Sequence, residues 1–127
     1  MTIHIDPHRL NDSLKKLGDI GSSPTGMQRL AYSNEDIEGR RYVTRLMSES
    51  GLKVRIDTAG NIIGRREGSD SRLPVIAMGS HTDTVPNGGK YDGALGVLGA
   101  IETIKTLNES CLVIRHPIEV VNFSNEE

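Results

Sequence analysis

Apolar side chains recur at intervals of three or four residues in three stretches of the chain, and this spacing predicts three helices. The first spans about residues 7–17: it follows an Asp-Pro pair that suits a helix N-terminus, and Gly18 is expected to end it. The second spans about residues 33–50 and begins at a serine cap. The third, about residues 93–109, is apolar around most of its circumference, which predicts burial. Residues 19–32 are rich in Gly, Ser and Pro and are predicted to form a loop.

Four further segments have the pattern of strands. Residues 52–57 alternate apolar and polar side chains, and residues 61–67 follow them across a Thr-Ala-Gly turn, so we expect a β-hairpin. Residues 73–80 are apolar on both faces, which is typical of a central strand in a sheet covered by helices. The last strand is expected at residues 117–123. This order of helices and strands predicts an α/β fold.

Composition and charge narrow the classes of function. The chain has 127 residues, enough for one small domain, and its 15 basic and 17 acidic side chains give a net charge of −2. Nucleic acids and anionic membranes need a basic face, so we expect neither partner. The sequence shows no apolar run near the ~20 residues of a spanning helix and no secretory signal pattern. The lone Cys111 is expected to be a buried thiol in a reducing compartment, which predicts a cytoplasmic location.

Side chains that can bind a metal ion follow the predicted strands directly. His81 and Asp83 lie just past the end of one strand, and Glu126 and Glu127 lie just past the end of the last strand. Asp92 lies in a glycine-rich loop at the N-terminus of the buried helix. Sites in open α/β sheets form outside the carboxyl ends of the strands. If the two strands are parallel, these five side chains converge on one edge of the sheet.

One imidazole and several carboxylates suit a divalent metal ion such as zinc, manganese or cobalt. Asp83 is placed to accept the second N–H of His81, which would fix the tautomer of the imidazole. The negative charge of Asp92 is favoured at a helix N-terminus, and a carboxylate can bridge two ions. If the backbone stays extended, Glu126 and Glu127 point in opposite directions, so that one can bind metal while the other acts as a general base.

Each of these residues also has a purely structural interpretation. His81 is then a surface or hydrogen-bonded histidine, Asp92 is a helix N-cap, and the Glu-Glu pair is a solvated acidic tail. A phosphate-binding loop is disfavoured, because Gly93, Gly96 and Gly99 have the spacing GxxGxxG and not GxGxxG. These glycines instead predict a helix face that approaches the sheet closely.

Taken together, the segments GSHTDTVPNGGKYDGALGVL and VVNFSNEE resemble the binuclear metal-dependent amidohydrolases. That family includes N-carbamoyl-L-amino acid hydrolases, allantoate amidohydrolases and β-ureidopropionase-like enzymes, within the aminoacylase and carboxypeptidase-like metallopeptidase superfamily. The segments GMQRLAYSNED and DTAGNIIGRREG are also similar to this family, so the resemblance covers nearly the whole chain from residue 18 onward. It implies a three-layer α/β/α catalytic domain of the zinc-hydrolase type.

The resemblance implies a role for each candidate residue. His81 and Glu127 match ligands of the first and the second metal ion, and Asp92 matches the carboxylate that bridges the two ions. Asp83 matches the acid that orients the imidazole. Glu126 matches the general base, which takes a proton from a metal-activated water and passes it to the leaving nitrogen. The implied reaction is hydrolysis of a linear, non-peptide amide C–N bond, with N-carbamoyl-L-amino acids as the favoured substrates.

Length is where the chain departs from this family. Family members continue well beyond this point, with two further histidine ligands and a lid domain through which they form homodimers. Residues 1–127 are therefore expected to be the amino-terminal part of the metal-binding catalytic domain, without the lid and dimerisation domain. By themselves they should bind metal poorly and show little turnover. Two other interpretations stay open: a peptidase or deacylase of the same superfamily, and a non-catalytic, truncated α/β module.

Overall fold

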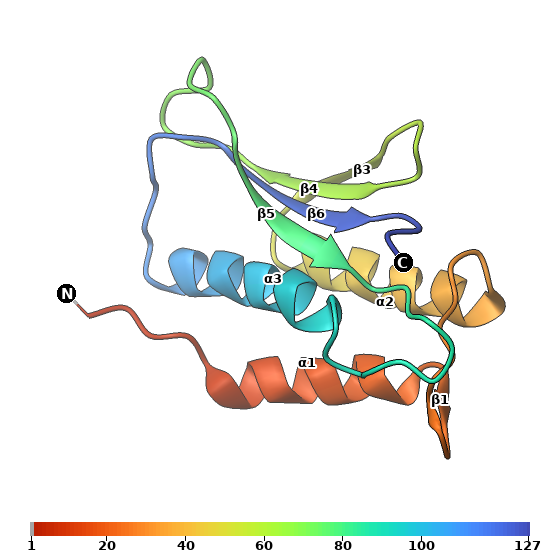
Figure 1. Cartoon of the computed structure of the whole chain (residues 1–127). Helices are drawn as coiled ribbons and strands as arrows, with labels where there is room; N and C mark the ends of the chain where they lie inside the picture. The colour runs from red at the N-terminus through yellow and green to blue at the C-terminus, as the bar shows by residue number, and fades with distance from the viewer. Residues whose placement is uncertain (1) are drawn as a thin grey trace.

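Three helices lie on one face of a four-stranded sheet in the computed structural model, which describes residues 2–127 (Figure 1). Two very short strands form a separate hairpin between the first two helices. The elements in chain order are α1 (Pro7–Asp19), β1 (Ser22–Ser23), β2 (Gly26–Met27), α2 (Asn34–Glu49), β3 (Lys53–Ile56), β4 (Ile62–Arg66), β5 (Ile76–His81), α3 (Ala94–Glu109) and β6 (Ile118–Phe123). This arrangement confirms the predicted α/β fold.

The strands of the main sheet are ordered β3-β4-β6-β5. β3 and β4 form the predicted antiparallel hairpin, and β4 is also antiparallel to β6. β5 and β6 are parallel, with a register that runs from Ile76 opposite Ile118 to His81 opposite Phe123. The carboxyl ends of β5 and β6 therefore lie next to each other at one edge of the sheet.

The first two helices begin where the sequence predicts. The side chain of Asp6 accepts hydrogen bonds from the backbone N–H groups of His8 and Arg9 at the start of α1. Ser33 accepts from the N–H of Asp36 at the start of α2. Such bonds satisfy N–H groups that have no partner within the helix. α1 ends two residues later than predicted, because Gly18 continues the helix to Asp19.

A single apolar core lies between the helices and the sheet. Each of the three helices contributes fully buried side chains to it, and β6 contributes Val120 from the centre of the sheet. Gly96 allows α3 to lie close to β5, because a Cβ at this position would be only 2.7 Å from the Cβ of Ser80. A Cβ at Gly99 would meet no atom within 4 Å, so this part of the predicted glycine stripe is not needed for packing.

Three local predictions are wrong. The segment 19–32 is not a simple loop, because it contains the β1–β2 hairpin. β5 is not a central strand within residues 2–127, where it pairs with β6 alone and leaves Ile76 44% exposed. Cys111 is exposed and not buried. It has a left-handed backbone (φ +52°) just after α3, where the chain leaves the helix and the core.

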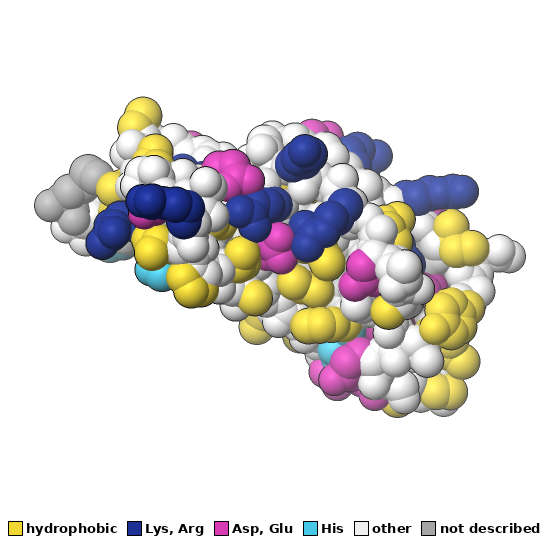
Figure 2. Space-filling view, turned by 90° about the horizontal axis from the view of Figure 1, so that it is seen from above, with side chains coloured by type: hydrophobic (Ala, Val, Ile, Leu, Met, Phe, Trp, Pro, Cys, Tyr) yellow, Lys and Arg dark blue, Asp and Glu magenta, His cyan; other side chains and the backbone are white. Residues whose placement is uncertain are grey.

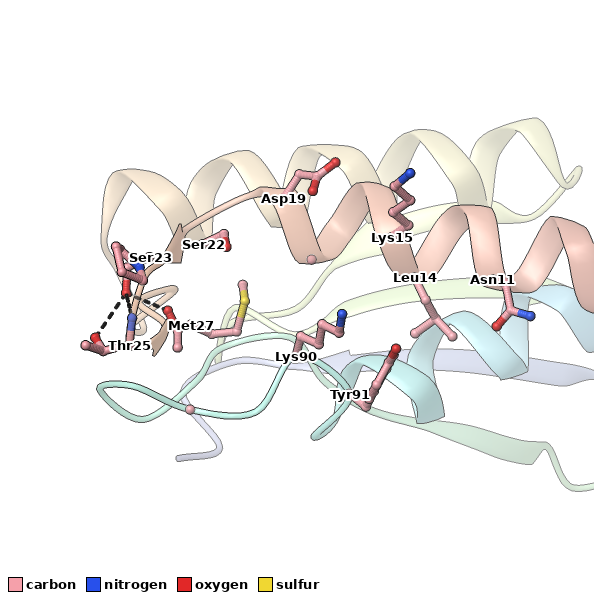
Figure 3. A pocket seen from close by; sticks show the side chains of 14 residues that line it. Asn11, Leu14, Lys15, Asp19, Ser22, Ser23, Thr25, Met27, Lys90 and Tyr91 are labelled. Atoms are coloured by element: carbon pink, nitrogen blue, oxygen red, sulfur yellow. Dashed lines mark hydrogen bonds between the residues drawn. The ribbon is translucent and has the colours of Figure 1, made fainter.

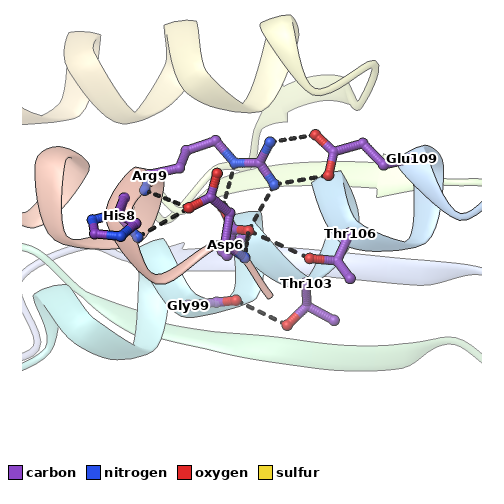
Figure 4. Close-up of polar contacts among 8 residues, drawn as sticks. Asp6, His8, Arg9, Gly99, Thr103, Thr106 and Glu109 are labelled. Atoms are coloured by element: carbon purple, nitrogen blue, oxygen red, sulfur yellow. Dashed lines mark hydrogen bonds and ion pairs between the residues drawn. The ribbon is translucent and has the colours of Figure 1, made fainter. Parts of the chain in front are cut away.

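An ion pair fastens the N-terminal end of α1 to α3 (Figure 4). The buried carboxylate of Glu102 accepts two hydrogen bonds from the Arg9 guanidinium, at 2.7 and 2.8 Å, and one from the backbone N–H of Asp6 at 3.0 Å. Burial alone would raise the pKa of Glu102, but these hydrogen bonds outweigh it and lower the pKa below its ordinary value. The carboxylate form is therefore part of the folded structure.

The other face of the sheet carries no helix within the described residues. On this face Glu119 of β6 forms ion pairs with Arg55 of β3 and Arg65 of β4, at 3.0 and 3.4 Å. Figure 2 views the molecule from above the sheet and shows Lys and Arg side chains in a band with acidic side chains among them, and further acidic side chains beside a histidine near one end. Residues 2–127 thus contain two of the three layers expected. None of their helices is both long and apolar enough to span a bilayer.

Candidate metal centre

The predicted ligands come together at the carboxyl ends of β5 and β6. His81 is the last residue of β5, and the chain turns back after β6 through Asn125, which has a left-handed backbone (φ +53°). As a result, His81, Asp92 and Glu127 each offer a ligand atom, and these three atoms all lie within 4.8 Å of one another. Three segments that are distant in sequence therefore meet at the sheet edge that the strand pattern indicated.

The imidazole of His81 is buried and fixed at one nitrogen. Its Nδ1 lies 2.9 Å from the backbone carbonyl oxygen of Asp83 and 3.7 Å from the carboxylate of the same residue. We infer that Nδ1 carries the proton and that this N–H donates a hydrogen bond to the carbonyl, which leaves the lone pair of Nε2 free to bind a metal ion. The orienting acceptor is thus the main chain of Asp83, whereas the sequence suggested its side chain.

The carboxylate of Asp83 has a different partner. Its Oδ2 accepts a hydrogen bond of 3.0 Å from the backbone N–H of Glu127, and its Oδ1 has no hydrogen-bond partner among residues 2–127. The side chain is only 2% exposed. Asp83 therefore contacts two of the candidate ligands: its carbonyl lies against the imidazole of His81, and its carboxylate accepts from the N–H of Glu127.

Asp92 does not serve as a helix cap. The N-cap position of α3 is Gly93, and no side chain caps this helix. The Asp92 side chain is 68% exposed, and its Oδ1 lies 3.7 Å from Nε2 of His81. Gly93 has a φ of +64°, and a Cβ there would lie 2.6 Å from Nε2 of the same imidazole. The glycine therefore lets the loop that carries Asp92 lie directly against His81.

The two terminal glutamates do not point in opposite directions, as the expectation of an extended backbone required. Oε2 of Glu126 lies 3.5 Å from Nε2 of His81, and a carboxylate oxygen of Glu127 belongs to the cluster of three ligand atoms. The reason is the turn at Asn125, which breaks the alternation of an extended strand. Both carboxylates consequently face the imidazole.

The donor set fits a divalent cation. Ligand atoms about 2.1 Å from a tetrahedral zinc ion lie about 3.4 Å from one another. Nε2 of His81 lies 3.7 Å from the carboxylate of Asp92, and the ligand atoms of His81, Asp92 and Glu127 all lie within 4.8 Å of one another. Within residues 2–127, no Lys or Arg nitrogen lies within 4.0 Å of the carboxylates of Asp83, Asp92, Glu126 or Glu127. A bound cation would offset this concentration of negative charge.

Sequence reasoning missed two residues that support the site. Asn122 of β6 is fully buried, and its amide exchanges hydrogen bonds with the hydroxyl of Thr82 at 3.0 and 3.3 Å, which ties the ends of β5 and β6 together. Arg29, in the segment predicted to be a loop, is also fully buried and contacts the residues that follow His81. A buried Asn within the apolar strand was the one signal that the sequence offered.

Two cavities adjoin the loop that carries Asp92. The smaller, about 250 Å³, opens beside the cluster and has Asp83 and Glu127 in its wall, together with the apolar Leu30, Val85 and Pro86. The larger, about 770 Å³, lies between α1, the β1–β2 hairpin and residues 88–91 (Figure 3). None of the candidate ligands lines the larger cavity, so the smaller one is better placed to receive a group that reacts at the cluster.

The chain is similar to known hydrolases. The model of the family described as Peptidase family M28 matches residues 61–127. The chain is 46% identical to an N-carbamoyl-L-amino-acid amidohydrolase from Pseudomonas sp. (strain NS671), over 99% of this chain and 31% of that protein. It is 41% identical to a ureidoglycolate hydrolase from Oryza sativa subsp. japonica, over 98% of this chain and 26% of that protein.

Solved structures agree with these matches. A hydantoinase/carbamoylase family amidase from Burkholderia ambifaria superposes with a TM-score of 0.97 at 38% identity, over 100% of this chain and 32% of that chain. The chain thus spans less than a third of the length of each of these relatives.

Proposed function

Because the chain belongs to peptidase family M28, we propose that it provides metal ligands and the general base of a metal-dependent amidohydrolase. The observation that carries this proposal is the convergence of His81, Asp92 and Glu127 at the carboxyl ends of two parallel strands. Such a position is the usual one for a site in an open α/β sheet. The relatives named as amidohydrolases support the same class of reaction.

We assign His81 and Asp92 to one divalent ion, and Asp92 and Glu127 to a second, with zinc, manganese or cobalt as the candidate metals. Each ion would then have two ligands from this chain, whereas catalytic zinc usually has three protein ligands. We therefore propose that residues 1–127 are the amino-terminal part of a catalytic domain, and that further ligands and a lid and dimerisation domain belong to the rest of the enzyme. Their match to about a third of each relative supports this assignment.

Bound divalent ions supply Lewis acidity, which polarises the substrate carbonyl and acidifies water. Glu126 is proposed as the general base because its carboxylate is 53% exposed and lies 3.5 Å from Nε2 of His81, so it faces the cluster and is open to substrate. Glu126 takes a proton from the attacking water as the water oxygen bonds to the amide carbon. It then gives the proton to the nitrogen as the C–N bond breaks. Asp83 keeps His81 in the required tautomer through its carbonyl.

We propose an N-carbamoyl-L-amino acid as the substrate, since this activity is in the name of a relative 46% identical to the chain. The ureidoglycolate hydrolase is similar at 41% identity, so ureidoglycolate is a competing candidate substrate. A peptidase or deacylase activity is the second candidate, favoured by the family description itself. A panel of N-carbamoyl amino acids, ureidoglycolate, N-acetyl amino acids and dipeptides distinguishes these activities.

Two variants of the complete enzyme test the assignment of the glutamates. Glu126→Gln should abolish turnover of N-carbamoyl amino acids and keep the metal content, because the base is lost while the ligands remain. Glu127→Gln should lower the metal content as well as turnover. Metal is measured by atomic absorption after dialysis, and turnover by the ammonia released. Loss of metal from Glu126→Gln alone would mean that the two roles are reversed, and full activity in both variants would refute the proposed site.

A further inference from the structure

Arg29 is fully buried and connects two parts of the molecule. Its Nε donates a 2.6 Å hydrogen bond to the carbonyl of Thr82, directly after His81. Its Nη1 donates to the carbonyls of Leu17 and Ile20 at the end of α1, at 2.7 and 2.6 Å. The planar fork of the guanidinium thus spans the gap between the first helix and the end of β5.

The main chain of Arg29 also holds this segment. Its N–H donates to the hydroxyl of Thr84 at 3.1 Å, and its carbonyl accepts from the N–H of Thr84 at 2.8 Å. Arg29 therefore contacts both residues that flank Asp83. Together these three hydrogen bonds fix the backbone of residues 82–84 from one side, while Asn122 fixes Thr82 from the other.

Burying this guanidinium is costly. No carboxylate oxygen lies within 4.0 Å of it, and its Nη2 has no hydrogen-bond partner, as far as residues 2–127 are concerned. Burial lowers the pKa of Arg29, and the negative charges of Asp36 and Asp83 only partly oppose this shift. α2 makes room for the side chain with Gly39, where a Cβ would lie 2.7 Å from Cδ of Arg29. A buried cation without a close ion pair costs stability, so its presence indicates a role beyond packing.

We propose that Arg29 is a positioning residue of the metal centre. It holds residues 82–84, and the central residue of this segment, Asp83, orients His81 through its carbonyl and Glu127 through its carboxylate. One arginine thereby sets two of the ligands without contacting either. The inference rests on the proposed function, because it treats these residues as metal ligands.

Binding of Co²⁺ to the complete enzyme is the first test, since its visible spectrum reports the geometry of the ligands. Arg29→Met keeps an unbranched side chain that reaches about as far as Nε but has no donors, and should lower the affinity for Co²⁺ and Zn²⁺ by about 10–100-fold, as the loss of other residues that orient ligands does. Arg29→Lys keeps a charge but not the fork, and should bind more weakly than the wild type. In Arg29→Ala, millimolar guanidinium should restore part of the affinity, whereas urea should not.

A matched control separates positioning from general stability. Val43→Ala removes two methyl groups from a fully buried side chain of α2 and should destabilise the fold while it leaves metal affinity and the Co²⁺ spectrum unchanged. If Arg29→Met and Arg29→Lys lose stability but bind both ions like the wild type, Arg29 has only a structural role and the proposal is overturned.

A measurement without metal keeps this inference distinct from the proposed function. In the metal-free, complete wild-type enzyme, long-range ¹H–¹⁵N spectra should show His81 as the single Nδ1–H tautomer. Arg29→Met should give a mixture of tautomers. If the complete wild-type enzyme binds no metal but this difference is seen, the positioning role stands and the metal centre is refuted. If the tautomer of His81 is the same in both proteins, the positioning role is refuted.

Discussion

Alanine at position 93 should weaken the metal centre as well as the fold. Gly93 lies between Asp92 and α3 with a φ of +64°, a conformation that favours glycine. A Cβ added there would collide with the carbonyl of His81 and would lie 2.6 Å from Nε2 and Cε1 of the imidazole. The added methyl group would therefore displace Nε2 of His81, the atom that we propose binds the metal ion.

The magnitude follows from these contacts. The left-handed backbone costs an L-residue about 1–2 kcal/mol. To reach the 3.4 Å at which ordinary contact begins, the imidazole must also move by about 0.8 Å. Well-formed metal sites hold their ligand distances within about 0.2 Å, so this displacement removes His81 from the centre. For Gly93→Ala we expect a loss of about 1–3 kcal/mol in the free energy of unfolding and an affinity for Zn²⁺ that is about 10–100-fold lower.

Gly99→Ala is the matched control, because a Cβ at this position in the same helix region meets no atom within 4 Å. It should stabilise the protein by about 0.5–1 kcal/mol and leave zinc binding unchanged. Urea unfolding followed by circular dichroism gives the stability, and competition with a chromophoric chelator gives the affinity. Wild-type zinc affinity in Gly93→Ala would refute the reasoning, and so would an equal loss of affinity in both variants.

Two further predictions concern the rest of the chain. Glu102→Gln should lower the free energy of unfolding by about 2 kcal/mol at neutral pH, because it removes a charged hydrogen-bond acceptor. Since the pKa of Glu102 is lowered in the folded state, the carboxylate stabilises the fold above the ordinary glutamate pKa of about 4.3, and this stabilisation is lost as the pH falls through the folded value. Urea unfolding between neutral and acidic pH should therefore show that the free energies of unfolding of the two proteins converge. A difference that stays constant with pH contradicts this. The 127-residue chain should hold fewer than two divalent ions tightly in calorimetric titrations with Zn²⁺, and two tightly bound ions per chain would show that no further ligands are needed.

Much of the site was predictable because its ligands follow the ends of recognisable elements. His81 comes directly after a run with the pattern of a buried strand, Glu127 lies four residues past another such run, and Asp92 precedes an apolar helix. Parallel strands place their carboxyl ends at one edge of a sheet, so sequence patterns bring these residues together without knowledge of any contact. The helix starts were predictable for a similar reason, since a cap involves residues only two or three positions apart.

The supporting contacts were not predictable, because they depend on distant main-chain atoms. The bond from Arg29 to the carbonyl of Thr82 joins residues 53 positions apart. The acceptor for His81 is a carbonyl group, which every residue possesses and no pattern marks. The direction of the two glutamates depends on one left-handed residue, Asn125, which the expectation of an extended backbone omitted.

The pairing of β5 with β6 determines whether the centre forms at all. Successive side chains of a strand alternate between the faces of the sheet, so a slip of one residue would move His81 to the other face and away from Glu127. Two features oppose such a slip. The buried amide of Asn122 is satisfied only by the hydroxyl of Thr82 in the observed register, and a Cβ at Gly79 would collide with the carbonyl of Val121 across the pair, so this glycine permits the close approach of the strands. A polar group that must be paired and a glycine that has no side chain thus fix the register, and the register brings two distant segments together as one metal centre.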